Sequence, residues 1–330
     1  MRSGIWCLDV TDARLTALKG FINDYRPTKS FVPLSGDASL RRYFRTENGI
    51  AVDAPPASQK NSEFLAVDRA LLEAGVRAPR VIRADLARGF MLIEDLGDAS
   101  LEAAARGAPA RELYLKALDA LLLLPRLRLP LPPFDQAFIA SELGIFREWM
   151  LEKTLGLKLS ASEERLLGHA FSVIAEGCLS QEQIPMHRDY HSRNLMVREG
   201  EIYVIDFQDM VTGPLAYDLI SLIYDCYTVL PEALAEELSA RAFEAYKARG
   251  FLKDKGFEAF RRDMDLTALQ RHLKVLGIFR RLWLRDRKPG YLRDLPRVLS
   301  YAAGEACRAG LPELADFLRR NLPEEVICAP

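Results

Sequence analysis

The side chains best suited to chemistry gather in one stretch, residues 186–209. A His-Arg-Asp tripeptide ends at Asp189, Asn194 follows five positions later, and Asp206 comes after an apolar run. The oxygen atoms of Asn194 and Asp206 suit Mg²⁺, which proteins bind through one or two carboxylates together with substrate phosphates. Asp189, on a loop facing the same point, is placed to act as a base toward a hydroxyl group. The order H-R-D-x-x-x-x-N followed by a metal-binding aspartate is typical of phosphoryl transfer.

A predicted hairpin must bring Asn194 and Asp206 together. Two runs rich in β-branched and aromatic residues, 195–197 and 202–205, flank Glu199-Gly200, which predicts a turn. If the turn is centred there, Asn194 faces the residue just before Asp206 on the neighbouring strand, roughly 5 Å away. The alternative is an ordinary polar loop beside an exposed hairpin.

The composition excludes several classes of protein. The chain has 330 residues, 49% hydrophobic and 28% charged, with a net charge of −1, so nothing draws it to nucleic acid or an anionic membrane. Its five cysteines are scattered without a C-x-x-C pair, which argues against a disulfide framework or a zinc site. No signal segment opens the chain, and its apolar runs are too short to cross a bilayer. We therefore expect a cytoplasmic monomer that binds neither nucleic acid nor membrane.

The first part of the chain is predicted to be rich in strands. A turn at Ser35 and Gly36 joins two strands where a kinase has its phosphate-covering loop, although G-x-G-x-x-G would have three glycines and this loop has one. A third strand at 50–52, a helix opened by Asn61 or Ser62, and strands at 81–84 and 90–93 follow. The next residues have the place of a hinge, and we expect the backbone of Glu94 and Leu96 to bind the edge of adenine.

The third strand departs from the usual kinase pattern. V-A-I-K laid over it puts Asp53 where a phosphate-pairing lysine belongs. Arg41, Arg42 or Lys60 is a candidate for the missing positive charge, because cationic side chains hold phosphate. The alternative for each is an exposed surface cation.

The remainder is predicted to be helical, so we expect a lobe of residues 1–95 and a second of 96–330. Helices are expected near 110–124, 136–154, 160–178, 231–249, 265–286, 294–308 and 311–321, and another that Gly213-Pro214 begins. This last helix carries Asp218 among apolar residues. A carboxylate there needs hydrogen-bond donors, and we expect it to brace the backbone N–H groups of the catalytic loop.

In these motifs the chain resembles the aminoglycoside phosphotransferase/choline kinase superfamily. More narrowly, it resembles the anomeric N-acetylmuramate/N-acetylglucosamine kinases of bacterial cell-wall recycling. The stretches that carry the resemblance are 36–45, 53–56 (Asp-Ala-Pro-Pro), 92–98, 187–196, 205–209 and 270–279. The resemblance implies an α+β, bilobal, protein-kinase-like fold with a small β-rich N-lobe and a larger, mainly helical C-lobe. It also implies that Asp-Ala-Pro-Pro is the usual occupant of the third-strand site.

The implied activity is phosphorylation of the anomeric hydroxyl of an N-acetylated amino sugar, with ATP and Mg²⁺. Asp189 would accept or orient the hydroxyl proton, while Asn194 and Asp206 hold the metal. The sugar is expected over the catalytic loop, between the helices 136–154 and 265–286. The candidates for binding it are Arg147, Trp149, His191, Arg193, Asp209 and Arg271.

Two other functions stay open. One keeps the chemistry and changes the acceptor to an aminoglycoside, choline or a fructosamine-type amine. The other is a non-catalytic nucleotide-binding module, suggested by Asp53 and the poor glycine loop.

Overall fold

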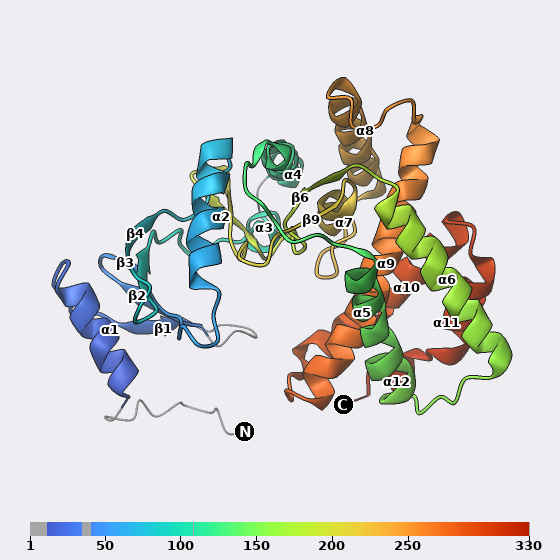
Figure 1. Ribbon diagram of the computed structural model, residues 1–330, viewed down its shortest axis with the longest axis horizontal. Helices are drawn as coiled ribbons and strands as arrows, with labels where there is room; N and C mark the ends of the chain where they lie inside the picture. The colour runs from blue at the N-terminus through green and yellow to red at the C-terminus, as the bar shows by residue number, and fades with distance from the viewer. Residues whose placement is uncertain (1–11, 35–40, 108, 330) are drawn as a thin grey trace.

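The computed structural model describes residues 12–34, 41–107 and 109–329. Figure 1 shows a small part built around one antiparallel sheet, and a larger part that is mostly helical. This is the bilobal arrangement that the sequence predicts. The elements of the small part are α1 (Ala13–Asn23), β1 (Val32–Leu34), β2 (Arg42–Thr46), β3 (Gly49–Asp53), α2 (Asn61–Ala74), β4 (Val81–Asp85) and β5 (Phe90–Ile93).

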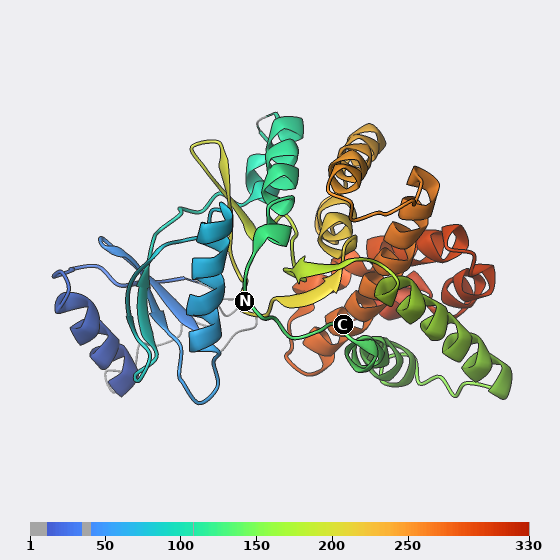
Figure 2. The ribbon, with the colours of Figure 1, turned by 45° about the horizontal axis from the view of Figure 1, so that its top comes forward.

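The sheet has the strand order β1-β2-β3-β5-β4, and its two faces are covered by different helices. Because side chains alternate along a strand, Ala51 of β3 packs with α1 and β5 residues, whereas Val52 packs with α2. All five residues of β3 are buried. In Figure 2 the two helices lie on opposite sides of the strands.

The connection between the two parts is fixed by arginines from both sides. Arg45 of β2 bonds the carboxylates of Asp95 and Asp98, with N–O distances of 2.7 and 2.8 Å. Arg198 donates to Glu94 at 2.8 Å. Residues 94–98 therefore have a defined conformation relative to the sheet and to the hairpin that contains Arg198.

The larger part contains two short pairs of strands and the remaining helices. Its elements are α3 (Leu101–Ala104), α4 (Ala110–Leu121), η1 (Leu124–Arg126), α5 (Gln136–Ile145), η2 (Phe146–Glu152), α6 (Ala161–Leu179), β6 (Gln183–Met186), β7 (Leu195–Arg198), β8 (Glu201–Val204), β9 (Val211–Pro214), α7 (Tyr217–Ile223), α8 (Glu232–Ala248), α9 (Phe257–Leu284), η3 (Pro289–Asp294), α10 (Leu295–Arg308), α11 (Pro312–Asn321) and α12 (Glu324–Ile327). The α6 helix opens with a capping box formed by Ser160 and Glu163.

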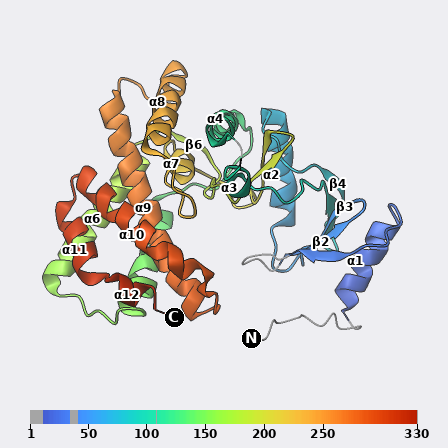
Figure 3. The ribbon, with the colours of Figure 1, turned by 180° about the vertical axis from the view of Figure 1, so that it is seen from behind.

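The 28-residue helix α9 runs through the centre of this part, as Figure 3 shows from behind. It is buried on nearly all sides, since α5, α6, α7, α8, α10, η2 and η3 all pack against it. Gly277 marks the closest approach, where an added Cβ would lie 2.4 Å from the carbonyl oxygen of Ile145. Only a glycine allows this crossing with the end of α5.

One expected helix changes type along its length, and another begins later than expected. The helix expected over 136–154 changes at Phe146 into a π-helix, η2. Gly213 and Pro214 do not begin a helix; they end β9, where they pair with Ile184 and Gln183 of β6, and α7 begins at Tyr217. Gly213 has a packing role instead, because a Cβ there would lie 2.7 Å from the sulfur of Met186.

In the three ranges that the structure describes, no helix is long and apolar enough to cross a membrane.

Candidate active site

The loop between β6 and β7 carries Asp189, and its backbone is held in an unusual conformation. Arg188 has a φ of +77°, in the left-handed region that side-chain-bearing residues rarely adopt. Asp218 accepts hydrogen bonds from the backbone N–H groups of His187 (2.6 Å) and Arg188 (2.9 Å). This is the bracing contact expected of Asp218. Burial raises the pKa of this carboxyl to about 6 even though the two bonds favour its charged form.

His187 links the two ends of the site. Its Nδ1 accepts from the N–H of Asp189 at 3.3 Å, and its Nε2 lies 3.0 Å from the carbonyl oxygen of Ile205. The neutral imidazole protonated at Nε2 satisfies both contacts. The loop that carries Asp189 is thereby tied to the residue that precedes Asp206.

The hairpin has the register that the sequence predicts. Leu195 pairs with Val204, Arg198 pairs with Glu201, and the N–H of Ile205 donates to the carbonyl oxygen of Asn194 at 3.0 Å. Asn194 and Asp206 are therefore neighbours across the two chain segments. Asp206 has a φ of +63°, which turns the chain directly after the strand.

The donor set of this corner fits a hard cation. Asn194 donates its Nδ2 to the carbonyl oxygen of Asp189 at 3.1 Å, so its amide oxygen is directed away from that bond. Gln208 donates to one carboxylate oxygen of Asp206 at 2.8 Å and leaves the other. One amide oxygen and one carboxylate, with room for phosphate and water ligands, match what Mg²⁺ prefers.

Asp189 stands among cations. Arg271 of α9 lies 3.3 Å from its Oδ1, and Lys274 and Arg188 are nearby. Desolvation would raise the pKa of Asp189, but the charges of Lys274 and Arg271 outweigh it and hold the pKa well below its usual range. The carboxylate is therefore ionised at neutral pH, and its side chain is 48% exposed.

Glu142 of α5 is buried behind the loop and binds two of these cations, Arg188 and Lys274. It accepts from Arg188 (2.7 Å), Lys274 (3.3 Å) and Gln270 (3.0 Å). Burial would raise the pKa of Glu142, but the charges of Lys274 and Arg188 lower it. These contacts place Lys274 of α9 in a buried ionic network with Glu142 and Arg188.

The cations proposed for phosphate binding face opposite sides of the sheet. Asp53 is fully buried beneath α1, where Arg14 and Arg42 each bond one of its oxygens at 2.5 Å. The expectation that Arg42 binds nucleotide is therefore wrong, because its guanidinium is engaged by Asp53 and Asp12. Asp53 itself does not occupy the place of the kinase lysine, since it points to the α1 face.

Arg41 lies on the other face, toward α2. Its guanidinium stands 5.0 Å over the ring of Phe64 and donates to the carbonyl oxygen of Lys60 at 3.2 Å. Phe64 in turn stacks on Phe207, next to Asp206, with ring centroids 4.8 Å apart. Arg41 is thus on the side of the sheet that faces the proposed metal corner.

The other nucleotide candidates are placed as follows. Ser35 and Gly36 lie outside the described residues. The N–H of Glu94 donates to the carbonyl oxygen of Arg80, and within the ranges described no hydrogen bond uses the carbonyl oxygen of Glu94 or the N–H of Leu96. Lys60 bonds Asp209 at 2.8 Å, joining α2 to the segment after Asp206.

Of the substrate candidates, His191 and Arg193 border the catalytic loop. The ring of His191 meets that of Tyr227 edge-on at 5.1 Å, and Arg193 lies 3.6 Å over the same tyrosine while bonding Glu102. Burial lowers the pKa of His191, so its imidazole is neutral. Its Nδ1 is buried without a hydrogen-bond partner in the structure as described.

Arg147 and Trp149 lie elsewhere, on η2. Arg147 pairs with Glu164 of α6 (2.5 Å) and with Glu152, and Lys153 covers the Trp149 ring at 3.6 Å. These carboxylates engage the guanidinium of Arg147, which argues against its predicted role in substrate binding.

Sequence reasoning missed Asp225, at the end of α7. This fully buried carboxylate accepts from the N–H and Oγ of Ser192 at 2.9 and 2.5 Å, and from the N–H of Tyr227 at 2.7 Å. It was missed because a carboxylate that follows an apolar helix belongs to no sequence motif. The signal that could have found it is that a buried carboxylate needs hydrogen-bond donors.

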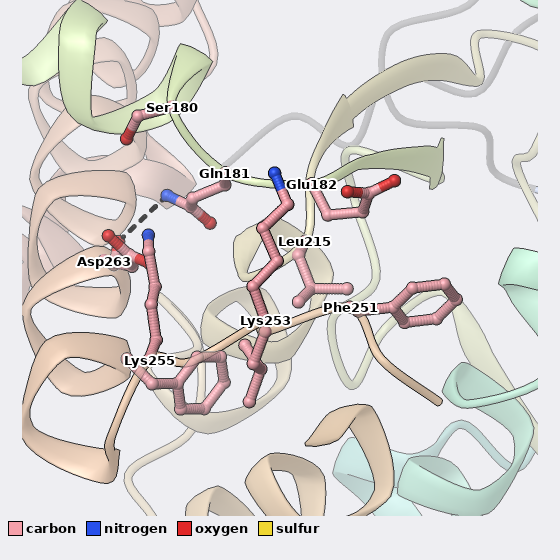
Figure 4. Close-up of a pocket in the computed structure, with 10 residues that line it drawn as sticks. Ser180, Gln181, Glu182, Leu215, Phe251, Lys253, Lys255 and Asp263 are labelled. Carbon is pink, nitrogen blue, oxygen red and sulfur yellow. Dashed lines mark hydrogen bonds and ion pairs between the residues drawn. The ribbon is translucent and has the colours of Figure 1, made fainter. Parts of the chain in front are cut away.

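A separate hollow at the start of β6 does not belong to this site. Figure 4 shows it lined by Gln181, Lys253, Lys255 and Asp263, among others, with Gln181 donating to the carbonyl oxygen of Asp263. Its volume of about 50 Å³ holds one or two waters and neither a nucleotide nor a sugar.

Comparison with known proteins agrees with this geometry. Residues 30–255 match the phosphotransferase enzyme family. The chain is 38% identical to the N-acetylmuramate/N-acetylglucosamine kinase of Pseudomonas putida, over 88% of this chain and 87% of that protein. It is 37% identical to the Pseudomonas aeruginosa kinase of the same name, over 90% of each.

Solved structures show the same fold at lower identity. A GDP complex of an aminoglycoside 2′-phosphotransferase superposes with a TM-score of 0.62 at 13% identity, over 89% of this chain and 97% of that one. A choline kinase from Streptococcus pneumoniae gives 0.60 at 13% identity, over 88% and 99%. An ADP-bound aminoglycoside phosphotransferase gives 0.61 at 12%, over 89% and 99%.

Proposed function

The chain belongs to the phosphotransferase enzyme family, and from this premise we propose that it transfers the γ-phosphoryl group of ATP to the anomeric hydroxyl of N-acetylmuramate or N-acetylglucosamine. It is a kinase that acts on a sugar hydroxyl, as its 37–38% identical relatives are named. The observation that carries the proposal is the convergence of Asp189, Asn194 and Asp206 on one corner, through the hairpin register and the bond from Asn194 to Asp189.

Asp189 has the role of orienting the sugar hydroxyl and receiving its hydrogen bond. Phosphoryl transfer depends mainly on positioning and on neutralising charge. The low pKa of Asp189 keeps it ionised, so it can accept that bond throughout the neutral range. An anomeric hydroxyl is more acidic than an ordinary alcohol, which suits an acceptor of such low basicity.

Asn194 and Asp206 are the residues that would hold Mg²⁺. When bound, the metal would neutralise charge on the β- and γ-phosphates. The support from this chain is its donor set: two oxygen-bearing side chains fixed by the hairpin, with Gln208 orienting Asp206.

For the nucleotide, we assign adenine to the backbone of Glu94 and Leu96, and the phosphates to Arg41 together with Ser35 and Gly36. Arg41 is favoured over Arg42 because it lies on the sheet face toward α2. We expect Arg41→Ala to raise the KM for ATP about tenfold or more, while Arg42→Ala lowers the melting temperature and leaves that KM within twofold. The opposite pattern in steady-state kinetics would move the phosphate site to the α1 face.

The acceptor is assigned to the region of His191, Arg193 and Asp209, on the C-lobe side of Asp189. We keep residues 1–95 as the nucleotide-covering lobe and 96–330 as the lobe of the catalytic loop. A monomer in a reducing cytoplasm is consistent with the four free cysteines among the described residues.

The test is turnover with each sugar and ATP, with ³¹P NMR to identify the phosphorylated position. We expect a sugar 1-phosphate from wild type and a loss of about 10³-fold or more in kcat for Asp189→Asn. Aminoglycosides, choline and a fructosamine belong in the same panel. Faster turnover of one of these would replace the acceptor, and no Mg²⁺-dependent turnover with any of them would favour the non-catalytic module.

A further inference from the structure

The buried side chain of Arg271, on α9, contacts the catalytic loop directly. It is 2% exposed, and its Nη1 donates both to the carbonyl oxygen of Arg188 at 2.8 Å and to Oδ1 of Asp189 at 3.3 Å. A guanidinium Nη carries two hydrogens, so one nitrogen makes both bonds. The Nε of Arg271 is buried without a partner in the described structure, and its guanidinium carbon lies 5.8 Å from the centroid of the Tyr217 ring.

The left-handed Arg188 needs such contacts. A non-glycine residue in this region costs about 1–3 kcal/mol and persists where its surroundings fix it from several sides. Here the N–H of Arg188 is bound by Asp218, its side chain by Glu142 and its carbonyl by Arg271. Each of the three partners comes from a different helix, α7, α5 and α9.

We propose that Arg271 is a positioning residue for phosphoryl transfer: it fixes the Arg188 carbonyl and Oδ1 of Asp189 together, and so presents Oδ2 of Asp189 to the acceptor hydroxyl. Across the described part of the chain, no hydrogen bond occupies Oδ2, and the Asp189 side chain is half exposed. The assignment rests on the proposed sugar-kinase function and names the reacting oxygen of its base.

This assignment replaces the earlier expectation that Arg271 binds the sugar. The Nη1 of Arg271 is already bonded to the Arg188 carbonyl and to Oδ1 of Asp189, so its described hydrogen bonds serve the loop. A positioning role and a binding role predict different kinetics. Loss of positioning lowers kcat, whereas loss of a sugar contact that is equal in ground and transition states raises KM.

The test compares Arg271→Lys and Arg271→Gln with Arg280→Lys. Arg280 is a matched control on the same helix: it is 5% exposed and donates to the carbonyl oxygens of Ile327 and Ala329, away from the loop. A misplacement of about 1 Å can cost about 10²-fold in rate. We expect Arg271→Gln to lower kcat about 10²-fold with both KM values within threefold, Arg271→Lys to recover part of it, and Arg280→Lys to keep kcat.

A second readout does not depend on turnover. Hydrogen exchange of the loop peptide around His187 and Arg188, followed by mass spectrometry, should speed up in Arg271→Gln and stay at the wild-type rate in Arg280→Lys. If Arg271→Gln raises the KM for sugar while kcat and the exchange rate stay at their wild-type values, Arg271 is a substrate ligand and the inference is overturned. If wild type phosphorylates none of the sugars, the proposed function fails, and the exchange result alone decides the role of Arg271.

Discussion

Replacing Asp225 by asparagine tests how strongly a buried carboxylate holds the catalytic loop. Three donors converge on it: the N–H and Oγ of Ser192 on one oxygen and the N–H of Tyr227 on the other. An amide has one acceptor oxygen, so in either orientation its NH₂ group faces a donor. The variant therefore cannot satisfy all three partners.

The size of the loss follows from these bonds. A buried donor left unpaired costs about 1–3 kcal/mol, and bonds to a neutral acceptor are weaker than those to a charged one by about 0.5–1.5 kcal/mol each. We expect Asp225→Asn to lower the free energy of unfolding by about 2–5 kcal/mol. Ser192 lies two residues before Asn194, so we also expect kcat to fall about tenfold or more.

The assay is urea unfolding followed by circular dichroism, with ADP release measured on the same preparations. Ser192→Ala removes one donor and should cost about 1 kcal/mol. The exposed Asp254→Asn is the control for a carboxylate-to-amide change and should stay within about 0.5 kcal/mol of wild type. An Asp225→Asn protein as stable and as active as the Asp254→Asn control would refute the reasoning.

The remaining predictions concern α9. Burial would lower the pKa of His272, but the charge of Glu305, 2.9 Å away, raises it to about 10. The pair therefore stabilises the fold fully below about pH 6.5 and loses this contribution as pH rises through 10. His272→Gln should cost about 3–5 kcal/mol at pH 6, with a gap from wild type that narrows toward pH 10 in urea titrations at several pH values; a gap independent of pH would contradict the ion pair. Gly277→Ala should lower the free energy of unfolding by at least about 1–3 kcal/mol, because its Cβ would lie 2.4 Å from the Ile145 carbonyl oxygen. The measurement is the melting temperature. An unchanged melting temperature would mean that α5 and α9 can move apart at little cost.

The local part of the site could be predicted from the sequence. The turn at Glu199-Gly200 and the alternation around it set the hairpin register, so the neighbourhood of Asn194 and Asp206 followed from adjacent residues. Asp218 was predictable for a related reason, since a carboxylate on an apolar helix has to find donors.

The rest depends on tertiary contacts that periodicity does not report. Arg271 and Lys274 are charged residues of the kind that a solvated helix face carries, yet both are buried on α9 because Asp189 and Glu142 reach them from other elements. Arg41 and Arg42 are adjacent in sequence and point to opposite faces of the sheet. Which of the two meets α1 is decided by the docking of that upstream helix, which ends at Asn23.

The pairing of Asp53 with Arg14 and Arg42 has a consequence for how this enzyme can be controlled. In protein kinases a lysine on this strand forms an ion pair with a glutamate of the neighbouring helix. Displacing that helix breaks the pair and inactivates the enzyme. Here Asp53 of β3 forms an ion pair with Arg14 of helix α1 instead, and α2 is held by the packing of Phe64 and its neighbours. Among the described residues no ion pair joins α2 to β3, so the switch that protein kinases build on that pair has no counterpart here.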